Sequence, residues 1–336
     1  MLRTSVIVVG FGAEPGLETC LSTLAAQVGV GDELVVVDNG IHHVDERRRR
    51  WPATVRLVRP GQNVGFAGGV NAGATEATGS VLVFVNSDLV VGTSAVRRLV
   101  QVVEKDPSVL ATGSLRLSSD PLTINSAGNP VHFTGIAWAG GFGQPATAHD
   151  AARPAASASG GFMAISRAKW EALDGFNSDY FMYHEDVELS LRAWMTGGRV
   201  EYVPTAVAIH DYEFSRNVLK MYHLERNRLI TVTTVYPPDV LRRVAPALFA
   251  AELGLLVLSV MQGWTRQKLR AYAWLWRNRH RLRARRAEVQ ASFTAPSETL
   301  TDLLSAHIDP AGFGAVRGLG MINRSLAAYW SLMRLR

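Results

Sequence analysis

Short apolar runs alternate with amphipathic stretches through the first half of the chain. Four of the runs predict strands, at about Thr4–Val9, Glu33–Val37, Val55–Val58 and Val81–Val85. Apolar residues at helical spacing between them, such as Leu17, Leu21 and Leu24, predict helices. Strands that alternate with helices indicate an α/β domain with a mostly parallel sheet flanked by helices.

The pattern changes beyond Ser114. From Ser114 to Ala158 the chain is rich in Gly, Ser, Pro and Thr, which predicts an irregular or antiparallel portion over the sheet, with a mobile stretch from Gln144 to Ala158. Regular patterns return at Gly161–Ser166, a strand at Val200–Val203 follows, and helices continue from Arg216. We therefore expect an α/β domain over residues 1–227 and a helical, basic extension over residues 228–336.

Charge separates the extension from the rest. The net charge is +6, but residues 264–286 hold nine Lys or Arg and no acid, which leaves about −3 elsewhere. The single cysteine, Cys20, excludes a disulfide framework. The chain opens almost directly on a strand, so we expect no signal peptide and a cytoplasmic location.

An apolar stretch of 18 residues, Val244–Met261, precedes the basic segment and is interrupted by Pro246 and Glu252. A membrane span needs roughly 20 predominantly apolar residues, so this stretch is at the short edge. Trp264, Trp274 and Trp276 among the arginines are typical of an interface-bound helix. Two alternatives stay open with equal weight, docking on an anionic membrane surface and a buried helix followed by a solvated basic one. Nucleic acid ranks lower, because no nucleic-acid-binding motif accompanies the charge.

Two acidic clusters stand at the ends of predicted elements. Asn86-Ser87-Asp88 closes the fourth strand, and the C-terminal ends of parallel strands are where open α/β sheets bind ligands. Asp88 is therefore a candidate metal or phosphate-site carboxylate. His184-Glu185-Asp186 opens a helix, where the dipole favours an ionised carboxylate that can take a proton.

Glycines mark two further places. Gly10, Gly12 and Gly16 imitate a dinucleotide fingerprint, but position 15, where the third glycine belongs, is proline. The loop Gln62–Asn71, leading to a helix at Ala72–Thr78, is a stronger signal, because Gly65, Gly68 and Gly69 let the backbone approach a ligand; a packed loop-to-helix junction is the alternative. Asp38 at the end of the second strand either binds a nucleotide or forms an Asp-Asn-Gly turn.

Together these residues resemble glycosyltransferase family 2, most of all bacterial rhamnosyltransferase-type members that use dTDP-L-rhamnose. The resemblance covers about Thr4 to Asn227 and rests on an ordered set of motifs: Asp38-Asn39-Gly40, Asn63-x-Gly65-Phe66-Ala67-Gly68-Gly69-x-Asn71, Asn86-Ser87-Asp88, Gly160-Gly161-Phe162-Met163, Gly175-Phe176, Phe181-Met182-Tyr183-His184-Glu185-Asp186 with Arg192, and Val203-Pro204 with His210. It implies a GT-A fold, a nucleotide-diphosphate sugar donor, a divalent cation (Mg²⁺ or Mn²⁺) and inversion at the anomeric carbon.

The resemblance also implies roles for residues. Asp186 is the general base, Asp88 and His210 hold the cation, and Gly160, Gly161 and Glu185 border the acceptor and sugar. Donor binding falls to Asp38, Asn63, Gly65, Phe66, Gly69, Asn71, Ser87 and Asp88. One departure concerns the first acid of the usual Asp-x-Asp motif, which is Asn86 here.

The expected function is transfer of a sugar, with L-rhamnose as the best guess, onto a cell-envelope glycan or polyprenyl-linked saccharide at the inner face of the membrane. Use of a UDP-sugar is an alternative. A nucleotide-binding oxidoreductase and a non-catalytic sugar-nucleotide-binding protein are the alternatives from other classes.

Overall fold

The structure, a computed structural model, describes residues 3–211, 218–309 and 319–334. These residues form two compact units. The first comprises residues 1–129, 139–193 and 198–213, and the second comprises residues 130–138, 194–197 and 214–336. The boundary expected after residue 227 falls inside helix α7 (Val218–Val235), and the expected helix start at Arg216 lies outside the described residues.

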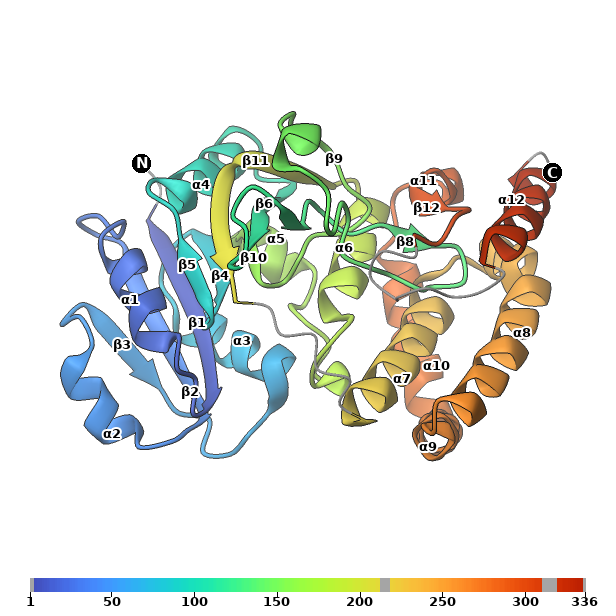
Figure 1. The fold of residues 1–336 in the computed structure, drawn as a ribbon, viewed down its shortest axis with the longest axis horizontal. Coiled ribbons are helices and arrows are strands. Elements are labelled where there is room, and N and C mark those ends of the chain that lie inside the picture. Colours follow the sequence, from blue (N-terminus) through green and yellow to red (C-terminus); the bar gives the residue numbers. More distant parts are fainter. Residues whose placement is uncertain (1–2, 212–217, 310–318, 335–336) are drawn as a thin grey trace. The chain divides into compact units, whose positions relative to one another are not determined.

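A ten-stranded sheet forms the centre of the first unit (Figure 1). Its main path runs β3-β2-β1-β4-β10-β6-β11-β5, with β7 beside β6 and β9 beside β11. The strands are β1 (Thr4–Gly12), β2 (Glu33–Ile41), β3 (Val55–Val58), β4 (Val81–Asn86), β5 (Leu89–Val91), β6 (Val109–Leu117), β7 (Ile124–Ser126), β9 (Arg153–Pro154), β10 (Phe162–Ser166) and β11 (Arg199–His210).

The four expected N-terminal strands are present and pair in parallel. The sheet is nevertheless mixed, because β10 lies antiparallel between β4 and β6 and β5 lies antiparallel to β11. The last expected strand is longer than Val200–Val203, since β11 continues to His210, whose backbone pairs with Leu89 beyond the end of β4. This pairing carries His210 to the edge of the sheet where Asp88 lies.

Helices cover the sheet, and the bounds of those in the first unit are α1 (Leu17–Ala25), α2 (Val44–Arg47), α3 (Gly65–Glu76), α4 (Ala95–Lys105), α5 (Arg167–Ala172) and α6 (Glu185–Met195). The prediction of a glycine-rich loop over Gln62–Asn71 is wrong for most of that range, because α3 already begins at Gly65. A Cβ on Gly69 would lie 2.7 Å from Val9, and one on Gly73 would lie 2.6 Å from Ile7. Close packing of α3 on β1 therefore outweighs the low helix propensity of glycine.

The stretch expected to be mobile, Gln144 to Ala158, is held against the sheet. Its strand β9 pairs with β11, and the hydroxyl of Tyr202 on β11 donates to the His149 carbonyl oxygen at 3.1 Å. The Gly, Ser, Pro and Thr content of the wider segment Ser114–Ala158 predicted irregular structure with mobility here, but these long-range hydrogen bonds determine the outcome.

The second unit is helical. Besides α7 it contains α8 (Pro238–Met261), α9 (Thr265–Arg277), α10 (Arg279–Ala291), α11 (Ser297–Leu303) and α12 (Leu319–Arg334), with a small parallel pair of strands, β8 (Val131–His132) and β12 (Leu304–Ser305). Residues 130–138, far away in sequence, belong to this unit: the Phe133 ring stacks on Trp330 at 4.7 Å, and Tyr236 donates to the His132 carbonyl oxygen.

Candidate functional site

Asp88 of the first acidic cluster and His210 lie side by side at the edge of the sheet. His210 Nε2 lies 3.1 Å from Asp88 Oδ2, and His210 Nδ1 lies 2.9 Å from Asn125 Oδ1 on β7. The amide oxygen of Asn125 is an acceptor, so Nδ1 is the nitrogen suited to donate to it, and Nε2 is the nitrogen that faces the Asp88 carboxylate.

The donor set suits a divalent cation that also binds a substrate diphosphate. Asp88 Oδ1 is buried and has no hydrogen-bond partner within the part of the chain that the structure describes. No group of three or more His, Cys, Asp or Glu able to hold a metal occurs among these described residues. Mg²⁺ commonly takes one or two protein carboxylates and completes its shell with phosphate oxygens and water, so Asp88 and His210 fit this mode.

A second acid near Asp88 was not anticipated from the sequence. Glu14, in the β1–α1 loop, has an unusual left-handed φ of 38°, and Arg47 Nη2 donates to its carbonyl oxygen at 2.7 Å. Burial raises the pKa of the Glu14 carboxyl, a hydrogen bond with Ser87 opposes the rise, and the charge of Asp88 adds to it. Ser87 therefore contacts the loop that follows β1.

The second acidic cluster is built around Asp186 at the first turn of α6. Its Oδ2 accepts a hydrogen bond from the Gly160 amide at 2.8 Å, and its Oδ1 accepts one from the Val187 amide at 2.8 Å. Burial raises the pKa of Asp186, while these backbone hydrogen bonds work in the opposite direction. A desolvated carboxylate held by backbone donors is an oriented proton acceptor.

Glu185 is buried beside it, with 5% of its surface exposed. Burial raises the pKa of Glu185 well above its usual range, and the charge of Asp186 adds to the effect. Its Oε2 has no hydrogen-bond partner among the described residues. In its protonated form Glu185 can offer a hydroxyl hydrogen to a nearby acceptor.

A glycine pair connects the two clusters. Gly160 donates to Asp186, and the carbonyl oxygen of Gly161 accepts from the Asn86 amide at 2.9 Å. A Cβ on Gly160 would lie 3.2 Å from Asp186 Cβ, and one on Gly161 would lie 3.1 Å from Asn86 Nδ2. The structure thus brings together Asp186, Gly160, Gly161 and the Asn86-Ser87-Asp88 segment.

Backbone strain gathers immediately before Asp186. Phe181, Tyr183 and His184 all have φ between 62° and 73°, a region that non-glycine residues seldom occupy. The Phe181 carbonyl oxygen accepts from the Ala67 amide at 3.1 Å, and a Cβ on Gly65 would lie 2.2 Å from that oxygen. Gly65 therefore makes room for the strained segment, whereas the sequence had predicted approach to a ligand.

The residues in and just before α3 that the sequence predicts to bind the sugar donor make many of their polar and packing contacts inside the protein. Asn63 Oδ1 accepts from the Gly65 amide at 2.9 Å, and Asn71 forms a pair of hydrogen bonds with the Phe176 backbone, at 2.7 and 3.0 Å. Phe66 packs near Phe176, with ring centroids 6.2 Å apart. Gly69 contacts Val9. These contacts show how the loop is organised; nucleotide binding by these residues stays a prediction.

Asp38 forms the turn that was one of its two interpretations. Its Oδ1 accepts from the amides of Gly40 and Ile41, at 3.1 and 2.9 Å.

Asn39, given no role from the sequence, is buried and bonds to Asn63 Oδ1 and to the Gly65 carbonyl oxygen. Phe11, also missed, is 54% exposed at the end of β1, and its ring lies 3.3 Å from the position of a Cβ on Gly40. The sequence signal for Phe11 was an aromatic residue where the apolar strand ends.

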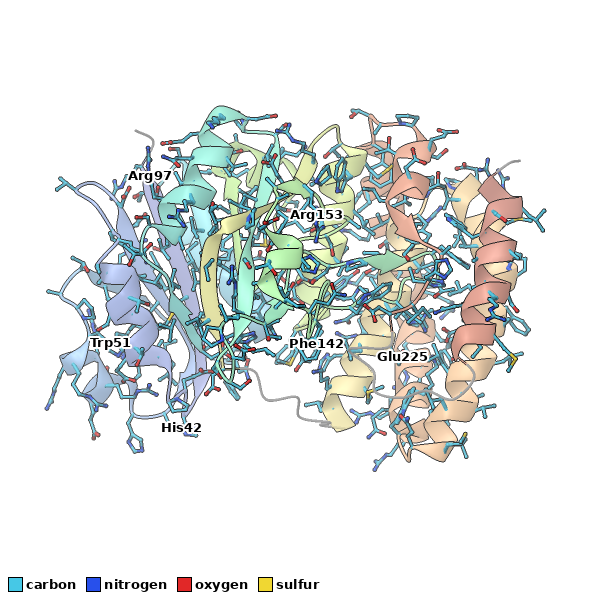
Figure 2. All side chains as sticks on the ribbon, turned by 45° about the horizontal axis from the view of Figure 1, so that its top comes forward. His42, Trp51, Arg97, Phe142, Arg153 and Glu225 are labelled. Carbon is cyan, nitrogen blue, oxygen red and sulfur yellow. The ribbon has the colours of Figure 1, made fainter. Side chains whose placement is uncertain are left out.

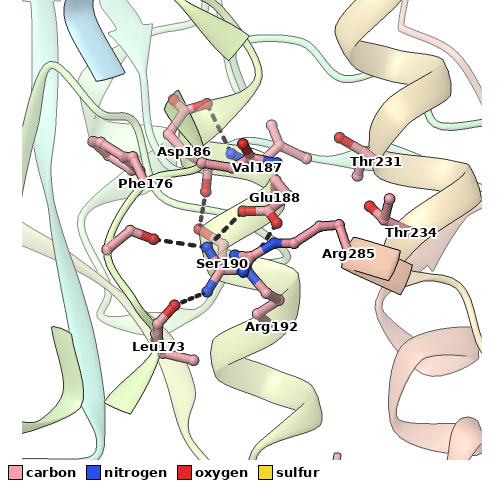
Figure 3. Close-up of polar contacts among 12 residues, drawn as sticks. Leu173, Phe176, Asp186, Val187, Glu188, Ser190, Arg192, Thr231, Thr234 and Arg285 are labelled. Atoms are coloured by element: carbon pink, nitrogen blue, oxygen red, sulfur yellow. Dashed lines mark hydrogen bonds and ion pairs between the residues drawn. The ribbon is translucent and has the colours of Figure 1, made fainter. Parts of the chain in front are cut away.

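A buried ion pair stabilises helix α6, which carries Asp186 (Figure 3). Arg192 on α6 pairs with Glu188 through Nε–Oε1 at 2.8 Å and Nη2–Oε2 at 2.6 Å, and it also donates to the carbonyl oxygens of Leu173 and Gly175. Their side chains are 3% and 0% exposed. Glu188 lies in the first turn of α6 and holds the guanidinium of Arg192, which in turn fixes the helix to the 173–175 turn.

The fold, a mixed sheet flanked by helices with a helical C-terminal part, is of the GT-A type. PcManGT, a mannosyltransferase from Pyrobaculum calidifontis solved with GDP-Man and Mn²⁺, has a similar fold: the TM-score is 0.53 at 18% identity, over 99% of this chain and 86% of that one. Residues 5–173 match the sequence profile of glycosyl transferase family 2, and the chain belongs to that family.

Curated relatives are distant. The N-acetylglucosaminyl-diphospho-decaprenol L-rhamnosyltransferase of Mycobacterium tuberculosis is 26% identical over 61% of this chain and 75% of its own. A probable N-acetylgalactosaminyltransferase 9 of Caenorhabditis elegans is 24% identical over 50% of this chain, which spans about a third of that protein's length (31%). Family membership disfavours the oxidoreductase alternative.

Proposed function

We propose that this protein is an inverting glycosyltransferase that moves a sugar from a nucleotide diphosphate to a hydroxyl group of a saccharide carried by a cell-envelope glycan or a polyprenyl lipid. L-Rhamnose from dTDP-L-rhamnose is the proposed donor. The observation that carries the proposal is the Gly160–Gly161 pair, which hydrogen-bonds the base candidate Asp186 on one side and the Asn86-Ser87-Asp88 segment on the other.

The reaction follows from these positions. The acceptor hydroxyl oxygen forms a bond to C1 of the sugar as the bond from C1 to the diphosphate oxygen breaks, and the hydroxyl proton passes to Asp186. The nucleoside diphosphate leaves from the opposite face, so the anomeric configuration inverts. Burial raises the pKa of Glu185, which favours the protonated form that can donate a hydrogen bond toward the sugars. The exposed ring of Phe11 offers a surface on which a base can stack.

A divalent cation, Mg²⁺ or Mn²⁺, held by Asp88 and His210, would neutralise charge on the departing diphosphate. Asn125 orients His210 for that position, and Asp88 presents the unpartnered Oδ1. The L-rhamnosyltransferase among the relatives supports the choice of sugar, and the Mn²⁺ with which PcManGT was solved supports the cation.

A donor screen tests the function. The purified chain is given a polyprenyl-diphosphate-linked N-acetylglucosamine acceptor and one donor at a time from dTDP-L-rhamnose, UDP-sugars and GDP-mannose, and products are weighed by mass spectrometry. We expect a product heavier by one deoxyhexose with dTDP-L-rhamnose. Transfer from a UDP-sugar alone would overturn the rhamnose assignment, and absence of transfer and of nucleotide binding with every donor would overturn the function.

The cation assignment makes a second prediction. Asp88→Asn keeps the shape and removes the charge, so we expect kcat to fall by about 10² to 10³. Isothermal titration of dTDP with and without MnCl₂ should show that binding of the nucleotide no longer depends on the metal. Asn86→Asp restores the missing acid and should tighten Mn²⁺ binding, whereas unchanged metal dependence in Asp88→Asn would exclude Asp88 as a ligand.

A further inference from the structure

Helix α8 exposes a long apolar face. Every exposed residue from Ala245 to Met261 is apolar, and Phe249, Leu253 and Val257, spaced four apart, are 67%, 52% and 61% exposed. In the described part of the chain, α8 is the one helix with the length and composition of a membrane span, with a mean hydropathy of 2.1 over its most apolar window and 17% of that window buried. A water-facing helix surface of this kind needs a partner.

The opposite face of α8 is fixed to its neighbours by buried ions. Glu252 accepts hydrogen bonds from Lys268 Nζ at 2.7 Å and Tyr272 Oη at 2.6 Å on α9, and it pairs with Arg228 on α7. The side chains of Lys268 and Arg228 are 0% and 3% exposed. Glu225 on α7, labelled in Figure 2, completes the network by bonding to both cations.

These ions are incompatible with a transmembrane α8. Burial works to raise the pKa of Glu252, but the charge of Arg228 and the hydrogen bonds from Lys268 and Tyr272 bring it to about 2, so the carboxylate is ionised. A spanning α8 would place Glu252 near the bilayer centre, where a charge is costly, and would break its bonds or draw α7 and α9 into the hydrocarbon. A helix that forms ion pairs with neighbouring helices on one face and is apolar on the other is suited to lie parallel to a membrane–water interface.

The positive charge of the helices that follow α8 favours an anionic partner. The exposed stripe of α9 mixes Leu269 and Trp276 with Arg266, Arg270 and Arg277, and no acid occurs from Trp264 to Arg286. Arg279 lies over the Trp276 ring at 4.7 Å. Arginine and tryptophan together are typical of residues at the headgroup level of an anionic membrane. A second copy of this chain would bring the same positive charges together.

We propose that α8 lies in the plane of an anionic lipid surface and docks through the Phe249–Leu253–Val257 face, with the arginines of α9 and α10 on the headgroups. The proposal rests on the proposed function for its purpose, since a polyprenyl-linked acceptor is presented at that surface. The contacts and charges that support membrane docking all belong to the second unit, so docking can be tested whether or not the protein transfers a sugar.

Vesicle flotation of the full chain tests the proposal without using activity. We expect binding to phosphatidylcholine vesicles that contain phosphatidylglycerol, weaker binding as salt rises, and little binding to phosphatidylcholine alone. The double variant Phe249→Ser/Val257→Ser leaves the charge unchanged and should weaken binding at least about tenfold. Leu122→Ser, at a 73% exposed position of the first unit, is the matched control and should bind like the unaltered chain.

Three results would overturn the proposal. One is equal vesicle binding by the double variant while its circular dichroism is unchanged. Another is retention of the chain in membranes after carbonate extraction, which indicates a spanning helix. The third is self-association in sedimentation velocity that the double variant abolishes, with no vesicle binding by the unaltered chain. Binding of dTDP, measured on the same samples, shows separately whether the nucleotide function holds.

Discussion

Asp186→Asn is expected to lower kcat by about 10² to 10⁴, because the amide cannot take the proton of the acceptor hydroxyl. Donor binding should change little. Asparagine can keep the hydrogen bond from the Gly160 amide through its single oxygen, but it cannot also accept from Val187, so a small fall in Tm should accompany the loss of turnover. Single-turnover kinetics and titration of the nucleotide separate these effects.

The pH profile gives an independent check on Asp186. Burial raises the pKa of Asp186, so the acidic limb of kcat/KM should lie above the range of an ordinary aspartic acid, with activity rising as the carboxyl loses its proton. Glu185→Gln is the matched control, since the glutamine side chain still offers a hydrogen-bond donor. Normal turnover in Asp186→Asn combined with loss in Glu185→Gln would assign the base to Glu185.

Arg192→Ala is expected to cost about 3 to 5 kcal/mol of folding free energy, because it leaves Glu188 charged and buried without its partner. The same change removes donors from the carbonyl oxygens of Leu173 and Gly175, so the turn that leads to Phe176 should loosen as well. Urea unfolding, followed by the fluorescence of the eight tryptophans and by far-UV circular dichroism, measures the loss.

Two controls define the role of this ion pair. Replacing both partners, in Arg192→Met/Glu188→Met, should recover part of the stability, since no charge stays buried. Arg199→Met breaks a surface ion pair with Asp106, whose side chain is 36% exposed, and should cost at most about 1 kcal/mol. A loss as small in Arg192→Ala as in Arg199→Met would show that Glu188 finds water or another partner.

Local patterns were sufficient for the features that depend on neighbours in sequence. Apolar runs located β1 to β4, and the polar residues that end β4 and open α6 located Asp88 and Asp186. The loop expected over Gln62–Asn71 is mostly helix, and the alternative of a packed loop-to-helix junction agrees with the structure. Glycine has low helix propensity, and nothing local reveals that Gly69 and Gly73 face Val9 and Ile7.

Long-range pairing explains what the sequence missed. Asn125 reaches His210 because β7 pairs with β6, although 85 residues separate the two side chains. The segment 130–138 carries no marker of its place in the helical unit, since Phe133 meets Trp330 through packing of residues far apart in sequence. Such contacts are decided by the assembled fold.

The Gly160–Gly161 pair has a consequence for how donor and acceptor preference can diversify. It contacts Asp186 through the main-chain amide of Gly160 and Asn86 through the carbonyl oxygen of Gly161, groups that every residue type except proline carries, and it leaves no side chain of its own in the site. Under the proposed function, substitutions in the surrounding loops can therefore change the preferred sugar while the main-chain spacing between Asp186 and the Asn86-Ser87-Asp88 segment is preserved.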